Sequence, residues 1–256
     1  MINSDIIVSA AVEEELAKLV DRIESPVFSI VGGRRITRGY IEGKPVRVLI
    51  TGPGTVNSVQ SLTAAIENAR PSLIIQTGCA GAFRESGLNI GDLGIATEEI
   101  DIQLGNEFED SRLPLNELPF SIIKNNNVDI KNRYPLDIKL VNQASEILAK
   151  VFEGKSVQVV KGSFVAVSTI TATYSRAKDI YKHYSPCMEG MEGAGAAHLA
   201  IHYDIPFLEI RSASNFVGKR DRSSWNLPLA FERGALAVLN LIRHEMCPTQ
   251  NGWGTH

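Results

Sequence analysis

The chain has 256 residues, enough for one large domain or two small ones with a sizeable core. Hydrophobic residues make up 44% and charged residues 21%, an ordinary composition for a globular protein, and the net charge of -3 argues against a general nucleic-acid binder. No apolar segment reaches the roughly 20 residues that a membrane-spanning helix needs, so we expect no membrane partner.

The three cysteines are far apart and odd in number, so they offer no CxxC pair and no disulfide framework, and we expect a reducing, cytoplasmic location. The first residues lack the basic start and the long apolar run of a signal peptide. His198 and His202 form one i, i+4 pair, but without an HExxH pattern this spacing favours packing or surface positions over metal binding. We therefore expect neither a metal nor a cofactor.

Short apolar runs alternate with segments of helical spacing along the first hundred residues. Strands are predicted at residues 6–10, 36–41, 46–50 and 71–77, the first and the last of them buried, and a turn leads into residues 93–102. Helices are predicted at residues 12–23, where three acids in the first turn suit the helix dipole, and at residues 56–69.

The second half continues the alternation after a polar, asparagine-rich stretch at residues 105–134, which we expect to be an excursion from the core. Helices are predicted at residues 136–152, 175–184 and 227–246, and a β-rich segment at residues 157–169. Residues 187–215 are predicted to form a loop, a helix, a turn and a strand with a polar end. This alternation predicts an α/β protein: a single domain over residues 1–256, with a central mixed β-sheet flanked by helices.

Two glycine-rich loops follow predicted strands. Backbone N–H groups of the first, GPG at residues 52–54, could hold an anion, although the loop matches neither GxGxxG nor a GK[ST] ending; a tight turn is the equal alternative. In the second, TGCAG, the small residues Cys79, Ala80 and Gly81 would let a flat ligand lie against the backbone, or they form a close-packed turn. No histidine is placed to activate Cys79, which favours a small buried residue over a nucleophile.

Acidic residues open two of the predicted helices. Residues 13–15 are consecutive glutamates that point in different directions, at ~100° per residue, so one could face the sheet and, if buried, deprotonate water. The alternative is a solvated first turn. Glu192 opens the small-residue helix and could bind the vicinal hydroxyls of a ribose, or it is a helix-start acid without a ligand. Glu189, in the predicted loop, is the weaker candidate.

Polar residues near the end of the last predicted strand are further candidates. Asn215 carries an amide with both a donor and an acceptor, and a turn-forming asparagine is the alternative. The following segment, GKRDRSSW at residues 218–225, places three cations beside Trp225 and could hold a carboxylate or a phosphate. The alternative there is a solvated loop in which Asp221 or Ser223 caps the next helix.

Five motifs, in this order and spacing, resemble the nucleoside phosphorylase and nucleosidase superfamily over residues 5–245: AAVEEELAKL, TGPGTVNSV, IIQTGCAGAF followed by SGLNIGD, GMEGAGAAHLA and IRSASN. They are most similar to the hydrolytic branch that includes the methylthioadenosine/S-adenosylhomocysteine nucleosidases. Within that branch, SNFVGKRDRSSW at residues 214–225 resembles the futalosine hydrolases.

The resemblance implies roles for individual residues. Glu15 matches the residue that activates the hydrolytic water, and Glu192 matches the acid that binds the 2′- and 3′-hydroxyls of the ribose. Met191 matches the methionine packed under the sugar. Cys79 falls where the family often has serine, near the sugar and the water.

The resemblance also concerns the base. Thr173 and Tyr174 fall near the base-stacking segment of the family, although STITATYS departs from the usual pattern. Asn215 stands where the adenine-specific nucleosidases carry aspartate. Hypoxanthine presents two acceptors, N7 and O6, to which an amide can donate and which a carboxylate would repel, so Asn215 indicates a 6-oxopurine.

From this resemblance we expect hydrolysis of the N-ribosidic bond of futalosine, which releases hypoxanthine and dehypoxanthine futalosine in the futalosine pathway of menaquinone biosynthesis. Glu15 would deprotonate the water, and Asn215 would stabilise the departing purine, with Asp221 as an alternative proton source. The glutamates at the first loop would repel phosphate, which favours water over phosphate as the acceptor.

The benzoate end of futalosine needs a cation, and the candidates near Trp225 are Lys219, Arg220 and Arg222, with Arg34, Arg35 and Arg84 elsewhere in the chain. Three alternatives stay open: an adenine nucleosidase for methylthioadenosine and S-adenosylhomocysteine, a phosphorylase, and a non-catalytic nucleoside-binding protein. Members of the superfamily are usually homo-oligomers, so the resemblance implies a homodimer or larger, to which residues 105–134 could contribute.

Overall fold

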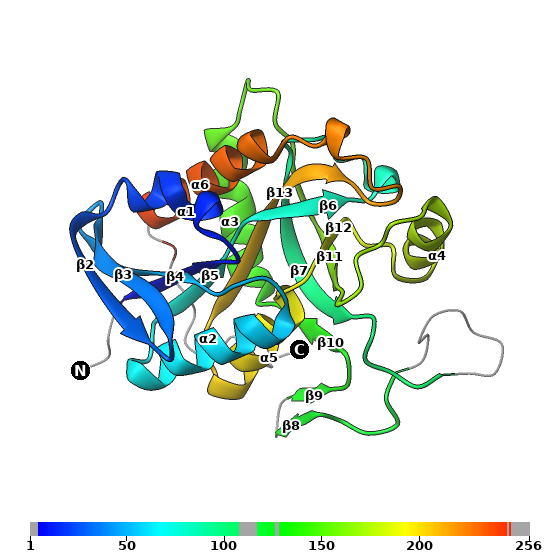
Figure 1. The fold of residues 1–256 in the computed structure, drawn as a ribbon, viewed down its shortest axis with the longest axis horizontal. Coiled ribbons are helices and arrows are strands. Elements are labelled where there is room, and N and C mark those ends of the chain that lie inside the picture. The colour runs from blue at the N-terminus through cyan, green and yellow to red at the C-terminus, as the bar shows by residue number, and fades with distance from the viewer. Residues whose placement is uncertain (1–4, 108–116, 126–127, 245, 247–256) are drawn as a thin grey trace.

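The structure is a computed structural model that describes residues 5–107, 117–125, 128–244 and 246. In this part of the chain, eleven strands form one mixed sheet with helices on both faces (Figure 1), which confirms the predicted α/β class. From one edge to the other, the order is β10 (Arg133–Pro135), β7 (Leu93–Asp101), β11 (Val159–Ala166), β12 (Met188–Gly190), β6 (Cys79–Ala82), β13 (Phe207–Phe216), β5 (Leu73–Gln76), β1 (Ile6–Ala10), β4 (Lys44–Ile50), β3 (Arg34–Ile41) and β2 (Glu24–Val31). Strands β8 (Ile123–Asn125) and β9 (Val128–Ile130) pair separately.

The long strand β13 joins the two halves of the sheet. Its first residues pair in parallel with β5, its last residues pair in parallel with β6, and residues 210–212 also pair antiparallel with β7. The first eight of its ten residues are buried, as expected for a strand that is covered by helices on both faces. Arg211, Ser212 and Ser214 are therefore buried within the sheet, and Asn215 is half-buried near the end of the strand.

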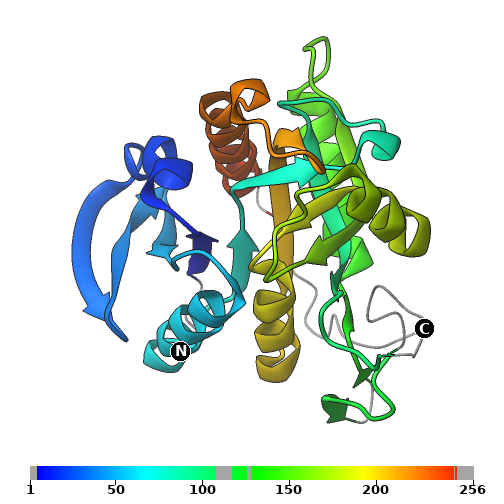
Figure 2. The same cartoon turned by 45° about the vertical axis from the view of Figure 1, so that its right-hand side comes forward.

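The helices form a layer on each face of the sheet (Figures 1 and 2). On one face, α1 (Glu13–Val20) and α3 (Ile138–Val151) pack against α6 (Leu227–Arg243). On the other face, α2 (Thr55–Asn68) packs against α5 (Gly193–Tyr203), and Gly195 allows the close approach because a Cβ there would collide with Thr55 and Val59. Helix α4 (Tyr174–Tyr184) lies apart from both layers.

Three features differ from the expected elements. Residues 24–31 form the exposed edge strand β2, which the sequence pattern did not predict, because exposed residues and Pro26 interrupt any apolar alternation. Residues 188–190, predicted to be loop, form the short strand β12 between β11 and β6. The polar excursion contains β8, β9 and β10, whereas its residues 108–116 and 126–127 lie outside the described part of the chain.

Within the described residues, no helix combines the length and the apolar character needed to cross a membrane.

Candidate active site

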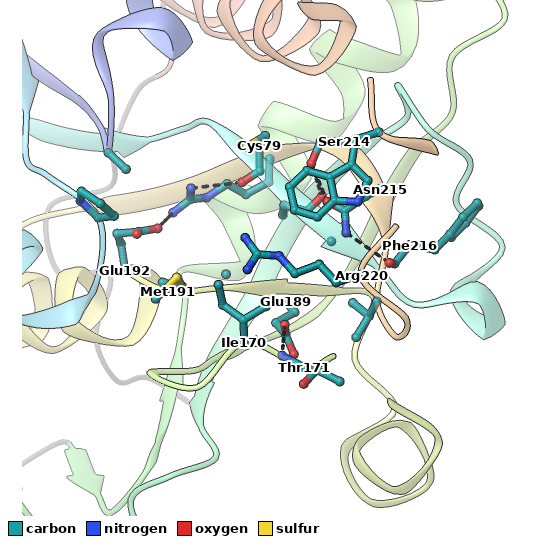
Figure 3. A pocket seen from close by; sticks show the side chains of 18 of the residues that line it. Cys79, Ile170, Thr171, Glu189, Met191, Glu192, Ser214, Asn215, Phe216 and Arg220 are labelled. Carbon is teal, nitrogen blue, oxygen red and sulfur yellow. Dashed lines mark hydrogen bonds and ion pairs between the residues drawn. The ribbon is translucent and has the colours of Figure 1, made fainter. Parts of the chain in front are cut away.

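A cavity of about 250 Å³ lies beyond the end of β1, beside strands β6, β12 and β13 (Figure 3). The ends of strands that meet in this way are where open α/β sheets place their sites. Nine residues that the sequence indicated line this cavity: Glu15, Cys79, Ala80, Gly81, Met191, Glu192, Asn215, Arg220 and Trp225.

Glu15 is the member of the glutamate triplet that faces the sheet, whereas the two preceding glutamates are exposed. One carboxylate oxygen accepts hydrogen bonds from the backbone N–H groups of Ala11 and Val12, at 3.0 and 3.2 Å. The other accepts from the backbone N–H of Cys79 at 2.8 Å. Because helix α1 begins directly after β1, the side chain is fixed between that strand and the second glycine loop.

Arg211 lies at the inner end of the cavity and was not singled out from the sequence. Its side chain is 1% exposed and donates through Nε to Glu209 at 2.8 Å and through Nη2 to Glu192 at 3.0 Å. Its Nη1 lies 3.5 Å from the carbonyl oxygen of Cys79. Glu192 also accepts from the backbone N–H of Gly54 at 2.8 Å, so the first glycine loop is bound to a carboxylate rather than open to an anion.

A buried pair of carboxyl groups lies behind Arg211. Glu99 and Glu209 are each 1% exposed, and both approach the position that a Cβ would occupy on Gly193, so only glycine fits there. Burial and then the negative charge of Glu209 raise the pKa of Glu99 well above its ordinary value, while Arg211 opposes the shift. This arrangement favours the protonated form of Glu99.

Asn215 has a defined amide orientation. Its Oδ1 accepts from the Ser214 hydroxyl at 2.8 Å, and its Nδ2 donates to the carbonyl oxygen of Phe216 at 3.1 Å, which leaves one N–H of the amide group available. The Nδ2 atom lies close to Gly81, where an added Cβ would be 3.4 Å from it and 2.9 Å from Cγ2 of Val217.

Glu189, the weaker candidate from the sequence, also lines the cavity, on the short strand β12. Its Oε1 accepts from the backbone N–H of Thr171 at 3.1 Å, and its Oε2 is buried without a hydrogen-bond partner among the described residues. Burial raises the pKa of Glu189, and Thr171 and the positive charge of Arg176 oppose the shift.

The predicted base-stacking residues lie elsewhere. Thr173 caps α4, where its hydroxyl accepts from the backbone N–H of Arg176 at 3.2 Å, and Tyr174 is 59% exposed. Neither residue lines the cavity; Ile170 and Thr171, a few residues earlier, do so instead. Because STITATYS departs from the family pattern, the motif did not determine which of its residues line the cavity.

The charged segment at residues 218–225 is divided between the cavity and the surface. Arg220 extends over the cavity (Figure 3), with its guanidinium 5.5 Å from the ring of Trp225. Asp221 is exposed and accepts from the backbone N–H and the hydroxyl of Ser223, at 3.0 and 2.6 Å. Asp221 and the exposed Arg222 do not line the cavity.

The remaining candidate cations do not line this cavity either. Arg34 donates to polar side chains of α2, and Arg35 lies over an aromatic ring of β2. Arg84 lies 4.2 Å from the ring centroid of Phe216, and Lys219 is exposed.

The cysteine and histidine residues offer no nucleophile or metal site in the described part of the chain. Burial, followed by the charge of Glu15, raises the pKa of Cys79 to about 12, so the thiol stays protonated near neutral pH. His198 packs edge-on against Tyr134, and His202 is separated from that contact by one turn of α5. No group of three or more His, Cys, Asp or Glu residues among those described is arranged to hold a metal ion.

Comparisons with known proteins show the family of the chain. The model of the phosphorylase superfamily matches residues 5–243. The 5'-methylthioadenosine/S-adenosylhomocysteine nucleosidase of Bacillus cereus (strain B4264) is 30% identical over 242 residues, which cover 93% of this chain and 96% of the relative. The protein of the same name from Bacillus licheniformis is 29% identical over 245 residues, with 93% and 98% covered.

Two kinds of solved structure share the fold. The 5'-methylthioadenosine/S-adenosylhomocysteine nucleosidase from Neisseria meningitidis, in complex with methylthio-immucillin-A, has a TM-score of 0.80 at 22% identity, with 94% of this chain and 100% of that chain covered. The native futalosine hydrolase of Helicobacter pylori strain 26695 has a TM-score of 0.80 at 18% identity, with 96% and 99% covered. The names of the sequence relatives thus agree with the adenine-nucleosidase alternative better than with the futalosine expectation.

Proposed function

Because the chain belongs to the phosphorylase superfamily and is an N-glycosyl hydrolase, we propose that it hydrolyses a 6-oxopurine nucleoside, with futalosine as the expected substrate. The single observation that carries this proposal is the amide of Asn215 beside the cavity floor. The identity of the purine is part of the proposal. At 29–30% identity to adenine nucleosidases, this chain can differ from them in the residues that contact the base.

The orientation of the Asn215 amide supports a base with acceptors on its edge. The hydroxyl of Ser214 holds Oδ1, so Nδ2 is the amide atom that lies beside Gly81 and Val217 at the cavity wall. Its available N–H can donate to O6 of hypoxanthine; N7 is an acceptor in both purines, so only a contact at position 6 distinguishes them. Adenine instead presents an amino group at position 6, and an amide N–H facing that group would leave two donors opposed. A buried polar mismatch of this kind rejects the wrong base.

The inner end of the cavity has the groups that hydrolysis requires. Glu15 is buried beside the cavity and serves as the base that takes a proton from the attacking water. Glu192, oriented by Gly54 and Arg211, keeps lone pairs for the ribose hydroxyls and stabilises the oxocarbenium-like transition state. Asn215 stabilises the negative charge that develops on the departing purine.

The outer end of the cavity suits the aromatic acid of futalosine. Arg220 supplies a guanidinium for a carboxylate, and Trp225 supplies a flat apolar wall. Asp221 and Arg222 are exposed and do not line the cavity, so Arg220 alone would bind the carboxylate of futalosine.

The second candidate is an adenine nucleosidase that acts on methylthioadenosine and S-adenosylhomocysteine. The names of the sequence relatives favour it, at 29–30% identity over 93% of this chain. It has the same fold and the same hydrolytic residues, and it differs in the purine and in the 5′ substituent.

The two candidates are separated by incubating the purified protein with futalosine and with methylthioadenosine in phosphate-free buffer. Release of hypoxanthine from futalosine, at a kcat/KM well above that for methylthioadenosine, is the expected result. Release of adenine from methylthioadenosine, with futalosine left intact, would establish the second candidate. Added phosphate is expected to leave the rate unchanged and to produce no sugar phosphate.

A further inference from the structure

Glu99 and Glu209 are a buried pair of carboxyl groups that the proposed hydrolytic steps do not use. Each is 1% exposed, and neither lines the cavity. Glu209 lies two residues before Arg211 on β13, so the two side chains extend from the same face of the sheet. Because burying a carboxyl group costs free energy, two such groups behind Arg211 indicate a role beyond packing.

Glu209 fixes one side of the Arg211 guanidinium. Its Oε1 accepts from the Nε of Arg211 at 2.8 Å and from the side-chain amide of Gln76, on the neighbouring strand β5, at 3.2 Å. With Nε bound in this way, Arg211 reaches Glu192 through Nη2 alone, at 3.0 Å. The third nitrogen, Nη1, lies 3.5 Å from the carbonyl oxygen of Cys79. The guanidinium is therefore held in one orientation by partners on three sides.

This orientation leaves lone pairs on both carboxylate oxygens of Glu192. Oε1 accepts one hydrogen bond, from the backbone N–H of Gly54 at 2.8 Å, and Oε2 accepts one from Arg211. Each oxygen of an ionised carboxylate has about two lone-pair sites, so each keeps one for a hydroxyl of the ribose. A guanidinium released from Glu209 can bind a carboxylate through two nitrogens, which would leave a single site on Glu192 for two hydroxyls.

Glu99 supplies a partner for the second oxygen of Glu209. The Oε2 atoms of the two groups lie 2.4 and 2.5 Å from the position that a Cβ would take on Gly193, so the carboxyl groups face one another there. Oε2 of Glu209 is buried and accepts no hydrogen bond from an N–H or hydroxyl group of the described residues. Burial, followed by the charge of Glu209, raises the pKa of Glu99, so its acid form is the donor for that oxygen.

We propose that Glu209 is a positioning residue for hydrolysis, which restricts Arg211 to a single hydrogen bond with Glu192. The acid of Glu99 supports this role by holding the second oxygen of Glu209. Neither residue reaches the cavity; both act through Arg211 on the carboxylate that binds the ribose hydroxyls. The inference rests on the ribose role proposed for Glu192 and is independent of which purine is bound.

The test replaces Glu209 by glutamine and compares a ribonucleoside with its 2′-deoxy counterpart. Futalosine and methylthioadenosine are each paired with the 2′-deoxy form, so either purine gives a result. Glutamine keeps an oxygen for Arg211 but removes the charge that makes the hydrogen bond to the guanidinium strong. We expect kcat/KM for the ribonucleoside to fall about 10-fold, the difference between a charged and a neutral acceptor. The 2′-deoxy counterpart has no 2′-hydroxyl for Glu192 to bind and should lose much less.

The matched control is Glu146→Gln, which removes a carboxylate from the exposed side of α3 and should leave the rates with both sugars unchanged. Equal factors of loss for the two sugars in Glu209→Gln, or no loss for either, would show that Glu209 serves the stability of the fold alone, and the inference would be wrong.

The unmodified protein tests the proposed function separately. The purine that it releases decides between the two candidate substrates and does not affect the inference. Equal kcat/KM values for the ribonucleoside and the 2′-deoxy counterpart in the unmodified protein would refute the ribose role of Glu192, and the inference would fail with it.

Variants of Glu99 provide a second comparison, in case Glu209→Gln folds poorly. Glu99→Gln keeps a donor for Oε2 of Glu209, whereas Glu99→Leu has a similar size and no donor. Glu99→Leu should lower the preference for the ribonucleoside over its 2′-deoxy counterpart, and Glu99→Gln should recover most of it. Thermal unfolding identifies the variants that are folded at the assay temperature. A folded Glu99→Leu protein with the preference of the unmodified chain would overturn the inference.

Discussion

Replacing Arg211 by methionine tests the charge balance of the site most directly. Methionine has a similar length but no charge, so the change removes the bonds to Glu192 and Glu209 while it fills most of the space. Arg211 is 1% exposed and the two glutamates are 5% and 1% exposed, so water cannot replace the guanidinium. Glu15 also loses a nearby positive charge.

The expected loss of stability is large. Removing one member of a buried ion pair costs about 3–5 kcal/mol because a charge is left uncompensated. For a domain of this size, each kcal/mol lowers the melting temperature by roughly 2–4 °C, so a decrease of roughly 6–20 °C is expected. Hydrolysis should fall as well, because Glu192 loses the donor that orients it toward the sugar.

The pH dependence of the destabilisation shows whether Arg211→Met acts through lost charge or through lost packing. Without Arg211, which opposes the shift, the pKa of Glu99 in the folded state rises further above its value in the unfolded chain. A group whose folded pKa is raised binds more protons in the folded state, so stability falls as pH increases from the unfolded pKa toward the folded one. The destabilisation caused by Arg211→Met should therefore be greater at pH 8 than at pH 5.

The assay is thermal unfolding of four proteins at both pH values: the unmodified chain, Arg211→Met, Glu209→Gln and the double variant. Glu209→Gln removes one of the negative charges that Arg211→Met leaves without a counter-ion. The double variant should therefore be more stable than Arg211→Met alone, with a coupling energy of about 0.5–3 kcal/mol. Strictly additive effects, or a destabilisation that does not change with pH, would show that Arg211 acts through packing rather than charge.

Further predictions concern the other buried groups. Glu15→Gln should lower kcat by about 10²- to 10⁴-fold, the usual contribution of a general base, whereas kinetics of the exposed neighbour Glu13→Gln should match those of the unmodified chain; equal kcat values for both variants would exclude Glu15 as the base. Glu99→Gln mimics the protonated acid toward Glu209, and because the raised pKa of Glu99 makes stability fall as pH rises above the unfolded value, the variant should gain relative stability at alkaline pH in thermal unfolding. Iodoacetamide should label Cys79 slowly at pH 8, since its pKa is raised to about 12, and rapid labelling measured by mass spectrometry would contradict the raised pKa.

Local patterns were sufficient for much of the fold. The alternation of apolar runs and helical spacing predicted β1, β4 and the helices α2 and α6 to within three residues at each end, because these elements bury one continuous face or lie wholly inside. Two elements were missed for opposite reasons. Strand β2 is an exposed edge with little apolar alternation, and β12 is three residues long, too short for any period to appear.

The site was less predictable because its contacts connect distant segments. Arg211 was visible only as a cation in a polar strand end. Its charge is balanced by Glu192 and Glu209, and Glu209 is in turn accommodated by Gly193, where a Cβ would collide with it. Glu189 was assigned to a loop, so its register with Gly81 could not be seen. The glutamate triplet was the opposite case, since one of three consecutive helical residues had to face the sheet, and that residue is Glu15.

The bonds around Glu192 also explain why water rather than phosphate suits this site. A phosphate ion would need backbone N–H groups of the glycine loop or a guanidinium at the inner end of the cavity. The N–H of Gly54 and the Nη2 of Arg211 both donate to Glu192, and the Nε of Arg211 donates to Glu209. The donors that an anion could have used are thus bound to carboxylates. Water, a neutral nucleophile, is not repelled by these carboxylates, whereas phosphate would be.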